Sequence, residues 1–536
     1  MLGRRSPQRQ LFDSQSLPHR VPADSFYGRM AAVSDKVFSD DDLKEMYCPD
    51  NGRPSLPPSL MSGVLLLQFY DDVSDVEASA RAVFDRRWQV ALDLPLDYSG
   101  FDPSSLSNFR KRLVEHGQER YAFDRFVAIG RAAGFIPDSV TALVDTTWTK
   151  GAGAVQDTYT LVRKGIRKLL RDMGYATPGK RRGLSAPAQA LVASYLDRDH
   201  KADIDWADPQ QRATQLKVLV QDAESALELA DVCSDDPDVR ATGWLLTKIL
   251  GDDIVEDDQG DPQIGKGTAT ERIISVTDPD MRHGRKSKAQ RFNGYKVAVA
   301  TEPSSDMILD IADVPASGSD GAHLLSAIQR IEEHAAVTVE RVIGDGAYTS
   351  GENLAACANY PAHPVDLLTP VARPKDGTVD KSAFQIDLQA GLATCPHGHT
   401  VVGQPTSQGS HRAGLRFTFP RADCEACPEF ACCVRSKSAG RTVQIGAYES
   451  YLQAQRKRQS LPEFKAEYRT RSRVERKQAE LVQHGIRHTR YLGDAKRQLQ
   501  RLWTGAVVNL KCLFRLAEIK NVDLRLIRHG LAASMA

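Results

Sequence analysis

Apolar residues recur at helical spacing through the first quarter of the chain. FSDDDLKEMY (38–47) and SDVEASARAVFDRRW (74–88) place apolar residues three and four positions apart, and NGRPSLPPS (51–59) breaks the pattern between them. DPSSLSNFRKRLVEH (102–116) begins near serines and carries a basic face. The pattern predicts a small all-helical domain over residues 21–136, which either contacts phosphates or is a purely structural bundle.

Short β-rich runs follow, separated by helical stretches. Residues 163–250 return to amphipathic helix, and AHLLSAIQRIEEHAA (322–336) is a further helix. Two neighbouring runs joined by a short turn are typical of a hairpin. This order predicts an α/β sheet interrupted by insertions. The predicted strands are TALVDTTWT (141–149), ERIISVTD (271–278), the hairpin pair GYKVAVATE (294–302) and MILDIADV (307–314), RVIGD (341–345) and DLLTPVA (366–372).

The composition is that of a globular chain, with 41% hydrophobic and 26% charged residues. The apolar run GVLLLQFY (63–70) is far shorter than the roughly 18 residues that a membrane span needs. The basic N-terminal stretch MLGRRSPQRQLF is not followed by the hydrophobic segment of a secretion signal. We therefore expect a cytoplasmic protein.

Charge is distributed unevenly along the sequence. The whole chain carries a net charge of only +1. Residues 451–530 contain 19 Lys and Arg against 7 Asp and Glu, a net charge of +12, so the remainder sums to −11. This asymmetry favours a polyanionic partner for the basic helical region, although a solvated helical surface would carry the same signal.

Five of the nine cysteines lie within residues 395–433. In a reducing compartment such clustering indicates metal binding before disulfide formation. Cys424 and Cys427 form a CxxC pair, Cys433 follows it and Cys395 lies upstream in CPHGH, so four thiolates would suit a structural Zn²⁺ ion. The alternatives are free thiols, or a ligand taken from His397, His399 or Cys432.

Three acidic residues are distinguished by the elements that carry them. Asp145 follows the apolar centre of one predicted strand, and Asp345 ends another. On the basic helix further along, Tyr468, Arg471 and Glu475 are spaced by three and four and therefore share one face. Carboxylates held together by rigid elements are what paired Mg²⁺ ions need for phosphodiester cleavage. Taken singly, each has a simpler explanation, as a turn residue or as half of an Arg–Glu helix pair.

Other residues have two readings each. Asp278 and Asp280 in VTDPDMR are alternative metal ligands, but Asp-Pro-Asp is more often a turn. The basic run HGRKSK (283–288), with Arg291, either holds a DNA backbone or forms a solvated loop. Trp148 either stacks on a flipped base or packs in the interior.

Several blocks of the chain together resemble the DDE transposases of bacterial insertion sequences, in the group with a tyrosine–arginine–glutamate signature. Residues 278–300 and NGRPSLPPS also resemble one subgroup, which has a cysteine-bearing insert before the glutamate. The similarity extends from about Phe38 to Gly493. The signature blocks are LVDTTW around Asp145, VIGDGAY around Asp345, and Tyr468, Arg471 and Glu475.

The resemblance implies an RNase H-like catalytic core in which Asp145, Asp345 and Glu475 bind two Mg²⁺ or Mn²⁺ ions. The lysine that ends the family signature, seven residues after the glutamate, is replaced here by Val482, and the nearest cations are Lys477 and Arg487. DNA contacts are expected from Tyr468, Arg471, Arg473, Lys477, Lys286, Lys288 and Arg291.

The implied reaction is metal-dependent cleavage at the ends of an insertion sequence, followed by attack of the freed 3′-hydroxyl on target DNA. The alternatives are a nuclease of the same fold that does not join strands, and an inactive, domesticated DNA-binding protein. The expected partners are double-stranded DNA, as terminal inverted repeats and target, and further copies of the chain, because two ends must be held together. We expect a cytoplasmic, nucleoid-associated location without membrane contact.

The predicted fold class is α/β, with an RNase H-like core, a helical N-terminal domain, a helical insertion and a cysteine-rich, zinc-like insertion. The predicted boundaries are a flexible N-terminus (1–20), a helical DNA-binding domain (21–136), the first part of the core (137–162), the helical insertion (163–268), the rest of the sheet (269–375), the cysteine-rich insertion (376–445), and the glutamate helix with basic C-terminal helices (446–536).

Overall fold

The computed structural model describes most of the chain, and the following concerns those residues. Most of the segment predicted as a flexible N-terminus lies outside them, as does Lys288. The described ranges are 1–4, 20–33, 37–198, 203–231, 235–267, 269, 271–286, 289–372, 378–406, 414–436 and 438–524.

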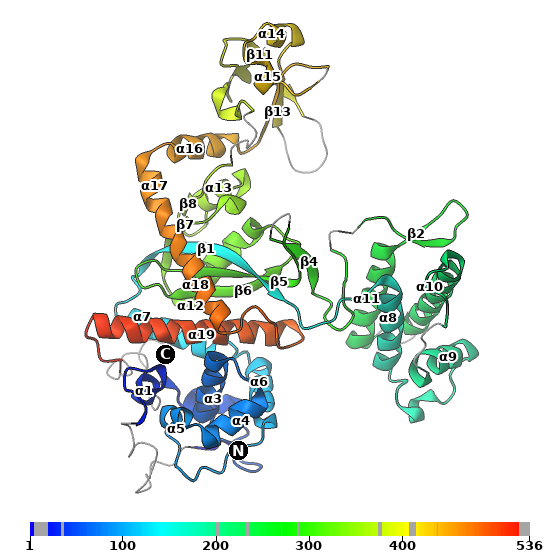
Figure 1. Ribbon diagram of the computed structural model, residues 1–536, viewed down its shortest axis with the longest axis vertical. Coiled ribbons are helices and arrows are strands. Elements are labelled where there is room, and N and C mark those ends of the chain that lie inside the picture. The colour runs from blue at the N-terminus through cyan, green and yellow to red at the C-terminus, as the bar shows by residue number, and fades with distance from the viewer. Residues whose placement is uncertain are drawn as a thin grey trace.

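A six-stranded sheet lies at the centre of the molecule (Figure 1). Its strand order is β4-β5-β1-β7-β8, and β6 also pairs with β5. The predicted hairpin is confirmed, because β5 and β6 are antiparallel, and β7 and β8 are parallel to β1. The strands are β1 (Ser139–Lys150), β4 (Arg282–Arg285), β5 (Arg291–Thr301), β6 (Ile308–Pro315), β7 (Thr338–Ile343) and β8 (Asp366–Leu368).

Two helices make the crossovers that parallel strands require. Helix α12 (Leu324–Ala335) leads from β6 to β7, and α13 (Gly351–Ala358) leads from β7 to β8. α12 buries Leu324, Ala327, Ile328, Ile331 and Ala335, which is one helical face. Each crossover begins at the sheet edge where a strand ends and returns the chain to the opposite edge, where the next parallel strand starts.

The long helix α19 (Asp494–Ile519) contacts both the sheet, at β6, and the N-terminal helices α3, α6 and α7 (Figure 1). Its middle third, from Leu502 to Leu510, is buried on every side. The helices predicted as an N-terminal domain therefore share one continuous hydrophobic core with the sheet. These helices are α1 (Phe26–Ala31), α3 (Pro58–Asp71), α4 (Asp75–Phe84), α5 (Arg86–Leu92), α6 (Ser104–Glu115), α7 (Tyr121–Ala132) and the 3₁₀ helix η3 (Asp41–Met46).

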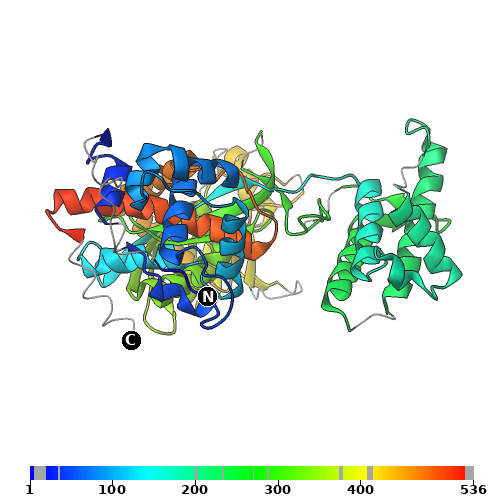
Figure 2. The ribbon, with the colours of Figure 1, turned by 90° about the horizontal axis from the view of Figure 1, so that it is seen from below.

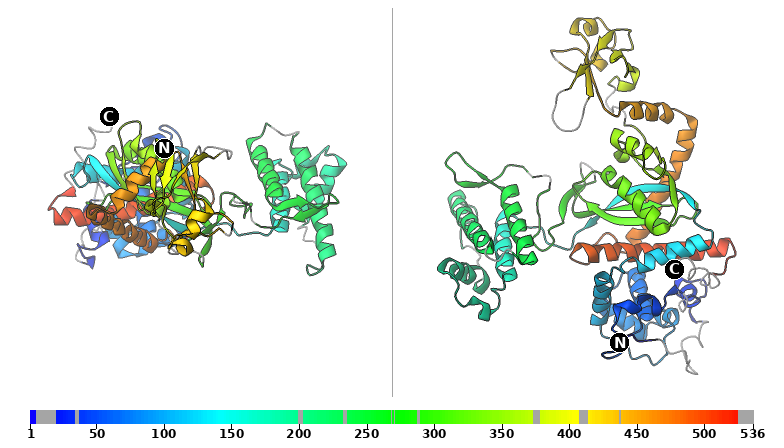
Figure 3. Two further views of the ribbon diagram at one scale, coloured as in Figure 1. Left: turned by 90° about the horizontal axis from the view of Figure 1, so that it is seen from above. Right: turned by 180° about the vertical axis from the view of Figure 1, so that it is seen from behind.

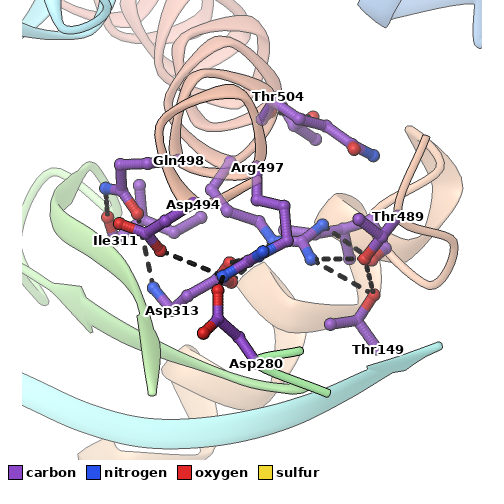
Figure 4. A network of polar contacts seen from close by, with 12 residues as sticks. Thr149, Asp280, Ile311, Asp313, Thr489, Asp494, Arg497, Gln498 and Thr504 are labelled. Atoms are coloured by element: carbon purple, nitrogen blue, oxygen red, sulfur yellow. Dashed lines mark hydrogen bonds and ion pairs between the residues drawn. The ribbon is translucent and has the colours of Figure 1, made fainter. Parts of the chain in front are cut away.

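A buried ionic network fixes the start of α19 to the sheet (Figure 4). The guanidinium groups of Arg497 and Arg501 lie 3.2 Å and 2.9 Å from Asp313 of β6. Arg497 also pairs with Asp278 and Asp280, so the Asp-Pro-Asp stretch serves this network and does not reach the cavity described below. Part of the positive charge of the C-terminal region is thus neutralised inside the protein.

The helical insertion forms a body of its own beside the sheet (Figures 2 and 3). Its first helix begins at Thr158, before the predicted boundary at residue 163. The insertion has its own hydrophobic core, to which α8, α10 and α11 contribute. Its elements are α8 (Thr158–Asp172), η4 (Pro178–Arg181), α9 (Ala186–Val192), the π-helical turn η5 (Ala193–Asp197), α10 (Pro209–Asp231), α11 (Pro237–Asp253), β2 (Ile254–Glu256) and β3 (Pro262–Ile264).

The strand predicted at residues 271–278 is wrong, since this stretch contains no described strand. Its apolar residues are buried at the base of the insertion: Ile273 and Val276 belong to the insertion's core, and Ile274 packs on Met281 and Tyr295. The backbone of this stretch forms a hydrogen bond at Ile274, whose carbonyl accepts from the N–H of Gln156. Burial between two bodies, not sheet pairing, explains the apolar pattern.

The cysteine-rich insertion lies at the opposite end of the molecule from the N-terminal helices (Figure 1). Two small antiparallel sheets form it, one of β9, β10 and β11 and one of β12, β13 and β14. Its elements are η8 (Lys381–Ala383), β9 (Gln385–Asp387), β10 (Leu392–Thr394), β11 (Thr400–Val402), β12 (Gln404–Pro405), β13 (Gly414–Thr418), α14 (Arg421–Glu425), α15 (Phe430–Cys433) and β14 (Thr442–Gly446).

The basic region that follows is helical as predicted, but the single helix expected around Tyr468 and Glu475 is interrupted. Helices α16 (Glu449–Gln459) and α17 (Pro462–Tyr468) lead into a 3₁₀ turn, η9 (Arg469–Arg471), before α18 (Ser472–Gln483) begins. The backbone angles stay in the right-handed helical region through the turn, so the helix tightens without changing hand.

Among the described residues, no helix is both long enough and apolar enough to span a membrane.

Candidate active site

Asp145 and Asp345 meet where the parallel strands β1 and β7 part. The last paired residues are Leu143 and Ile343, and each aspartate lies two positions beyond its partner in that pair. β7 ends at Ile343 while β1 continues to Lys150, so the two side chains lie side by side where the parallel pairing stops. The backbone N–H of Ala347 donates to the Asp345 carboxylate at 2.8 Å. The simple reading of Asp345 as a turn residue is therefore correct, and it does not preclude a second role.

Glu475 approaches the same edge from α18. Its carboxylate lies 2.7 Å from the Arg471 guanidinium, which also lies 3.3 Å from the Asp145 carboxylate. The Arg471 guanidinium stands 6.0 Å from the centre of the Tyr468 ring. Despite the 3₁₀ turn, Tyr468, Arg471 and Glu475 thus remain on one side, as the spacing predicts, and Arg471 bridges two of the three acids.

One open cavity of about 540 Å³ brings these groups together. Acidic, cationic and aromatic side chains all line it, and two of the cations, Arg471 and Lys296, pair directly with acids of the lining. No single stretch of sequence contains this surface, because β1, β4, β5, the turn after β7, α18 and the loop after α18 each contribute to it. Its lining includes Asp145, Asp320, Asp345, Glu475, Arg471, Arg487, Lys286, Lys296, Trp148 and Phe292.

The charge in the cavity is only partly compensated. The pKa of Asp145 is raised to about 6, chiefly by burial and to a smaller extent by the nearby carboxylates of Asp345 and Glu475. The backbone N–H of Thr146 and the Arg471 guanidinium act in the opposite direction, but they do not cancel the effect. A buried carboxylate with an elevated pKa beside other carboxylates is a site that a cation would stabilise.

Sequence reasoning missed two residues of this cavity, Asp320 and Lys296. The Asp320 carboxylate accepts a hydrogen bond from the Thr146 hydroxyl at 2.8 Å and lies 2.7 Å from the Lys296 ammonium. Thr146 is the residue after Asp145, so this pair supports the strand that carries the first acid. Asp320 belongs to no recognisable motif, and nothing in the sequence marks Lys296 as a site residue. The pairing of β1 with β5 sets Lys296 opposite Trp148, and Lys296 pairs in turn with Asp320.

The residues around Asp345 pack tightly behind the site. A side chain at Gly344 would meet the Tyr348 ring at 3.0 Å and Val144 at 3.1 Å, so glycine permits the close contact between β1 and the turn. Tyr348 is buried, and burial followed by the carboxylates of Asp145, Asp320 and Asp345 raises its pKa. Asn353 donates to the carbonyls of Gly321 and Tyr348, which joins the two turns beside the cavity.

The remaining predicted DNA contacts have different environments. Lys286 lines the cavity, and Arg291 is exposed on β5 beside Arg285. Arg473 is 42% exposed and lies 3.6 Å from Asp306. Lys477 is only 4% exposed, and its ammonium contacts Cys512 and Glu480 inside the protein.

The cavity residues fit a divalent metal by the chemistry of their donors, since Mg²⁺ prefers hard carboxylate oxygens and one or two of them per ion. Asp145, Asp345 and Glu475 supply such oxygens on one surface, and the Arg471 guanidinium lies between two of them. As they stand, the described side chains include no group of three or more His, Cys, Asp or Glu residues arranged to hold a metal ion. Arg471 now occupies the position between Asp145 and Glu475 that a cation would share.

The four predicted zinc ligands also lie around one small cavity, of about 30 Å³, together with His397 and His399. Cys432 is exposed and lies outside that lining. Tight turns support the thiols: the N–H of Gly398 donates to the Cys395 carbonyl, and that of Cys427 donates to the Cys424 carbonyl. All cysteines of the described residues are free thiols. The cysteine lining is Cys395, Cys424, Cys427 and Cys433.

Comparison with protein families gives two matches, one in each half of the chain. A family model described as a transposase DDE domain matches residues 394–514, which include Glu475. A second, described as a transposase domain (DUF772), matches residues 15–112, among the N-terminal helices. No curated protein and no solved structure matches the chain. The mixed α/β fold, with two strands parallel to the first and an antiparallel hairpin beside it, is consistent with an RNase H-like core. Both matches are to transposase models, and together they support a DDE transposase of an insertion sequence.

Proposed function

We propose that this transposase cuts DNA at the ends of its insertion sequence and joins the freed 3′-hydroxyl to target DNA. Asp145, Asp345 and Glu475 would hold two Mg²⁺ or Mn²⁺ ions. When bound, such ions activate the attacking oxygen and stabilise the leaving one. The observation that carries the proposal is that these three acids, from two strands and one helix, line a single open cavity.

The side chains have separate tasks in this proposal. In the first step water attacks a phosphodiester, which leaves a 3′-hydroxyl and a 5′-phosphate. In the second step that hydroxyl attacks a target phosphodiester, so one ester bond forms as another breaks. Arg471 neutralises Asp145 and Glu475 while the cavity is free of DNA, and its remaining N–H groups are suited to a phosphate. Tyr468 supports Arg471 through its ring.

The proposed DNA contacts are Tyr468, Arg471, Arg473, Lys286 and Arg291. We leave Lys477 out, because its ammonium is buried against Cys512 and Glu480. Terminal inverted repeats and target DNA would be the substrates. A homo-oligomer that holds two ends together and a cytoplasmic location at the nucleoid belong to the same proposal, as does membership of the subgroup with a cysteine-bearing insert.

The test is Mg²⁺-dependent nicking of DNA that contains the ends of the element. Asp345→Asn is expected to lower the nicking rate by about a thousandfold or more, the scale of losing one member of a catalytic group. The matched control is Asp138→Asn. Asp138 directly precedes β1, and its side chain is 95% exposed. Nicking by Asp345→Asn at the wild-type rate would overturn the proposed site.

A strand-transfer assay with labelled element ends separates the proposal from the two alternatives. Joined products are expected from wild type. Cleavage without joining would indicate a nuclease of the same fold, and binding without cleavage would indicate an inactive DNA-binding protein.

We further propose that Cys395, Cys424, Cys427 and Cys433 hold one structural Zn²⁺ ion. Two observations support this: the four cysteines line one cavity, and tight turns begin at Cys395 and at Cys424. Elemental analysis of purified protein should give about one zinc per chain. Cys427→Ser should lose it, whereas Cys432→Ser, a change outside the cavity, should keep it. Equal zinc content in both variants would contradict this ligand set.

A further inference from the structure

Arg487 lies on the wall of the candidate active site. It belongs to the loop after α18, which Gly485 turns with a φ of +81°. The loop then pairs with the end of β1: the N–H of Lys150 donates to the Arg487 carbonyl at 2.9 Å, and the N–H of Thr489 donates to the Lys150 carbonyl at 3.0 Å. The backbone on both sides of Arg487 is therefore fixed to the strand that carries Asp145.

The Arg487 side chain is held by two neighbours on β1. Its guanidinium donates to the Thr147 hydroxyl at 2.8 Å and to the Trp148 carbonyl. It also lies 4.4 Å from the centre of the Trp148 ring, well within the range of a cation–π contact. Phe292 supports the indole in turn, with ring centres 5.7 Å apart and planes at 28°. The tryptophan thus serves as a platform for the arginine.

Arg487 differs from Arg471 and Lys296, two other cations of the cavity, in its charge balance. Arg471 pairs with Asp145 and Glu475, and Lys296 pairs with Asp320. Among the described residues, no Asp or Glu forms an ion pair with Arg487, and its hydrogen bonds go to neutral oxygens. Burial lowers its pKa, with no opposing carboxylate. A guanidinium has five N–H donors, so unused donors remain available in the cavity.

We propose that Arg487, held by Trp148, binds a DNA backbone phosphate next to the phosphodiester that is cut. The inference rests on the proposed function. A phosphate is the anion that a DNA-filled cavity brings to this wall, and a planar guanidinium suits it in two-point geometry. Trp148 is then a positioning residue for Arg487. Arg487 lines the same cavity as Val482, the position at which the signature lysine is missing.

The test measures binding separately from cleavage. A fluorescein-labelled 40-base-pair duplex, taken from DNA flanking the coding region, is titrated without divalent metal. Arg487→Gln keeps a hydrogen-bonding side chain and should bind about tenfold more weakly, with the slope of log K against log salt reduced by about one. Arg487→Lys should restore the slope. Lys520→Ala, which removes an exposed cation outside the cavity, should leave affinity nearly unchanged.

Single methylphosphonate substitutions then locate the phosphate. In wild type, one neutral phosphate within two nucleotides of the mapped nick should weaken binding, and the same substitution should cost Arg487→Gln nothing further. Trp148→Ala should lose part of this coupling, whereas Trp148→Phe should keep more of it. An unchanged salt slope and a full methylphosphonate effect in Arg487→Gln would overturn the inference. Loss of nicking in Asp345→Asn would still stand in that case, so the two proposals fail separately.

Discussion

Arginine and aspartate meet at two places on the central sheet, with opposite consequences. At the start of α19, Arg497 and Arg501 are 3% and 0% exposed and share Asp313, which is 8% exposed (Figure 4). In the candidate active site, Arg471 and Asp145 are 19% and 15% exposed, and Glu475 is 55% exposed. The first set is closed to solvent, whereas the second opens into a cavity.

The two clusters also differ in how completely their charges are matched. Arg497 alone has four carboxylates within ion-pair distance, from Asp278, Asp280, Asp313 and Asp494. In the cavity, Asp145 keeps an elevated pKa despite Arg471, and Arg487 has no carboxylate partner among the described residues. Paired charges in the closed interior stabilise the fold. Unpaired charges in the open cavity can instead be neutralised by a bound ligand.

The largest expected effect separates activity from stability. Glu475→Gln should lower nicking by about a thousandfold or more, a barrier increase of about 4 kcal/mol or more. The melting temperature should stay near that of wild type, because the side chain is 55% exposed. Glu463→Gln, an exposed glutamate in the first turn of α17, should change neither quantity. If Glu475→Gln unfolds, the prediction is contradicted, because Glu475 would then stabilise the fold as the Arg497 and Arg501 network does.

The second change breaks the structural cluster. Asp313→Ala leaves two buried guanidinium groups without their shared carboxylate and should lower the free energy of unfolding by about 3–5 kcal/mol. Denaturant unfolding measures it. Asp494→Ala is the matched control from the same network, because that side chain is 78% exposed and should cost under about 1 kcal/mol. Similar losses in both variants would mean that burial does not govern the network.

The third change uses the pKa of Asp145, which rises from 3.8 to about 6 on folding. The folded state then binds the proton more tightly than the unfolded state, so stability from this group falls as pH rises from about 4 to about 6. Asp145→Asn removes that penalty. It should raise the free energy of unfolding by about 2–3 kcal/mol at pH 8 and by little at pH 4.

Thermal unfolding of wild type and Asp145→Asn over this pH range measures the effect. Bound Mg²⁺ should shift the wild-type curve, because it favours the ionised carboxylate. A difference between the two proteins that does not change from pH 4 to pH 8 would show that Asp145 titrates normally.

Local patterns in the sequence predict much of this molecule. The hairpin of β5 and β6, the crossover helix α12 and the basic helices after residue 446 follow from period-two and helical spacing, which neighbouring residues set among themselves. Spacing alone left Asp145, Asp345 and Glu475 as weak candidates, and the resemblance to DDE transposases singled them out, so their role stays a prediction. The spacing of Tyr468, Arg471 and Glu475 survives even the 3₁₀ turn between their helices.

Features that depend on distant residues could not be predicted in this way. The apolar stretch 271–278 has a strand-like composition, yet it is buried at the base of the helical insertion. Lys477 lies on a basic helix, yet α19 covers it with Cys512. Asp320 and Arg487 belong to no motif and reach the cavity only through pairing with β1 or its neighbours.

The sequence by itself determined which elements form and which side chains carry candidate chemistry, because backbone preference and amphipathic spacing act over a few residues. Only the tertiary structure decided which charges are buried in pairs and which face an open cavity. That decision rests on burial and strand register, and both depend on contacts between segments hundreds of residues apart, such as Asp145 with Arg471 and Asp313 with Arg501.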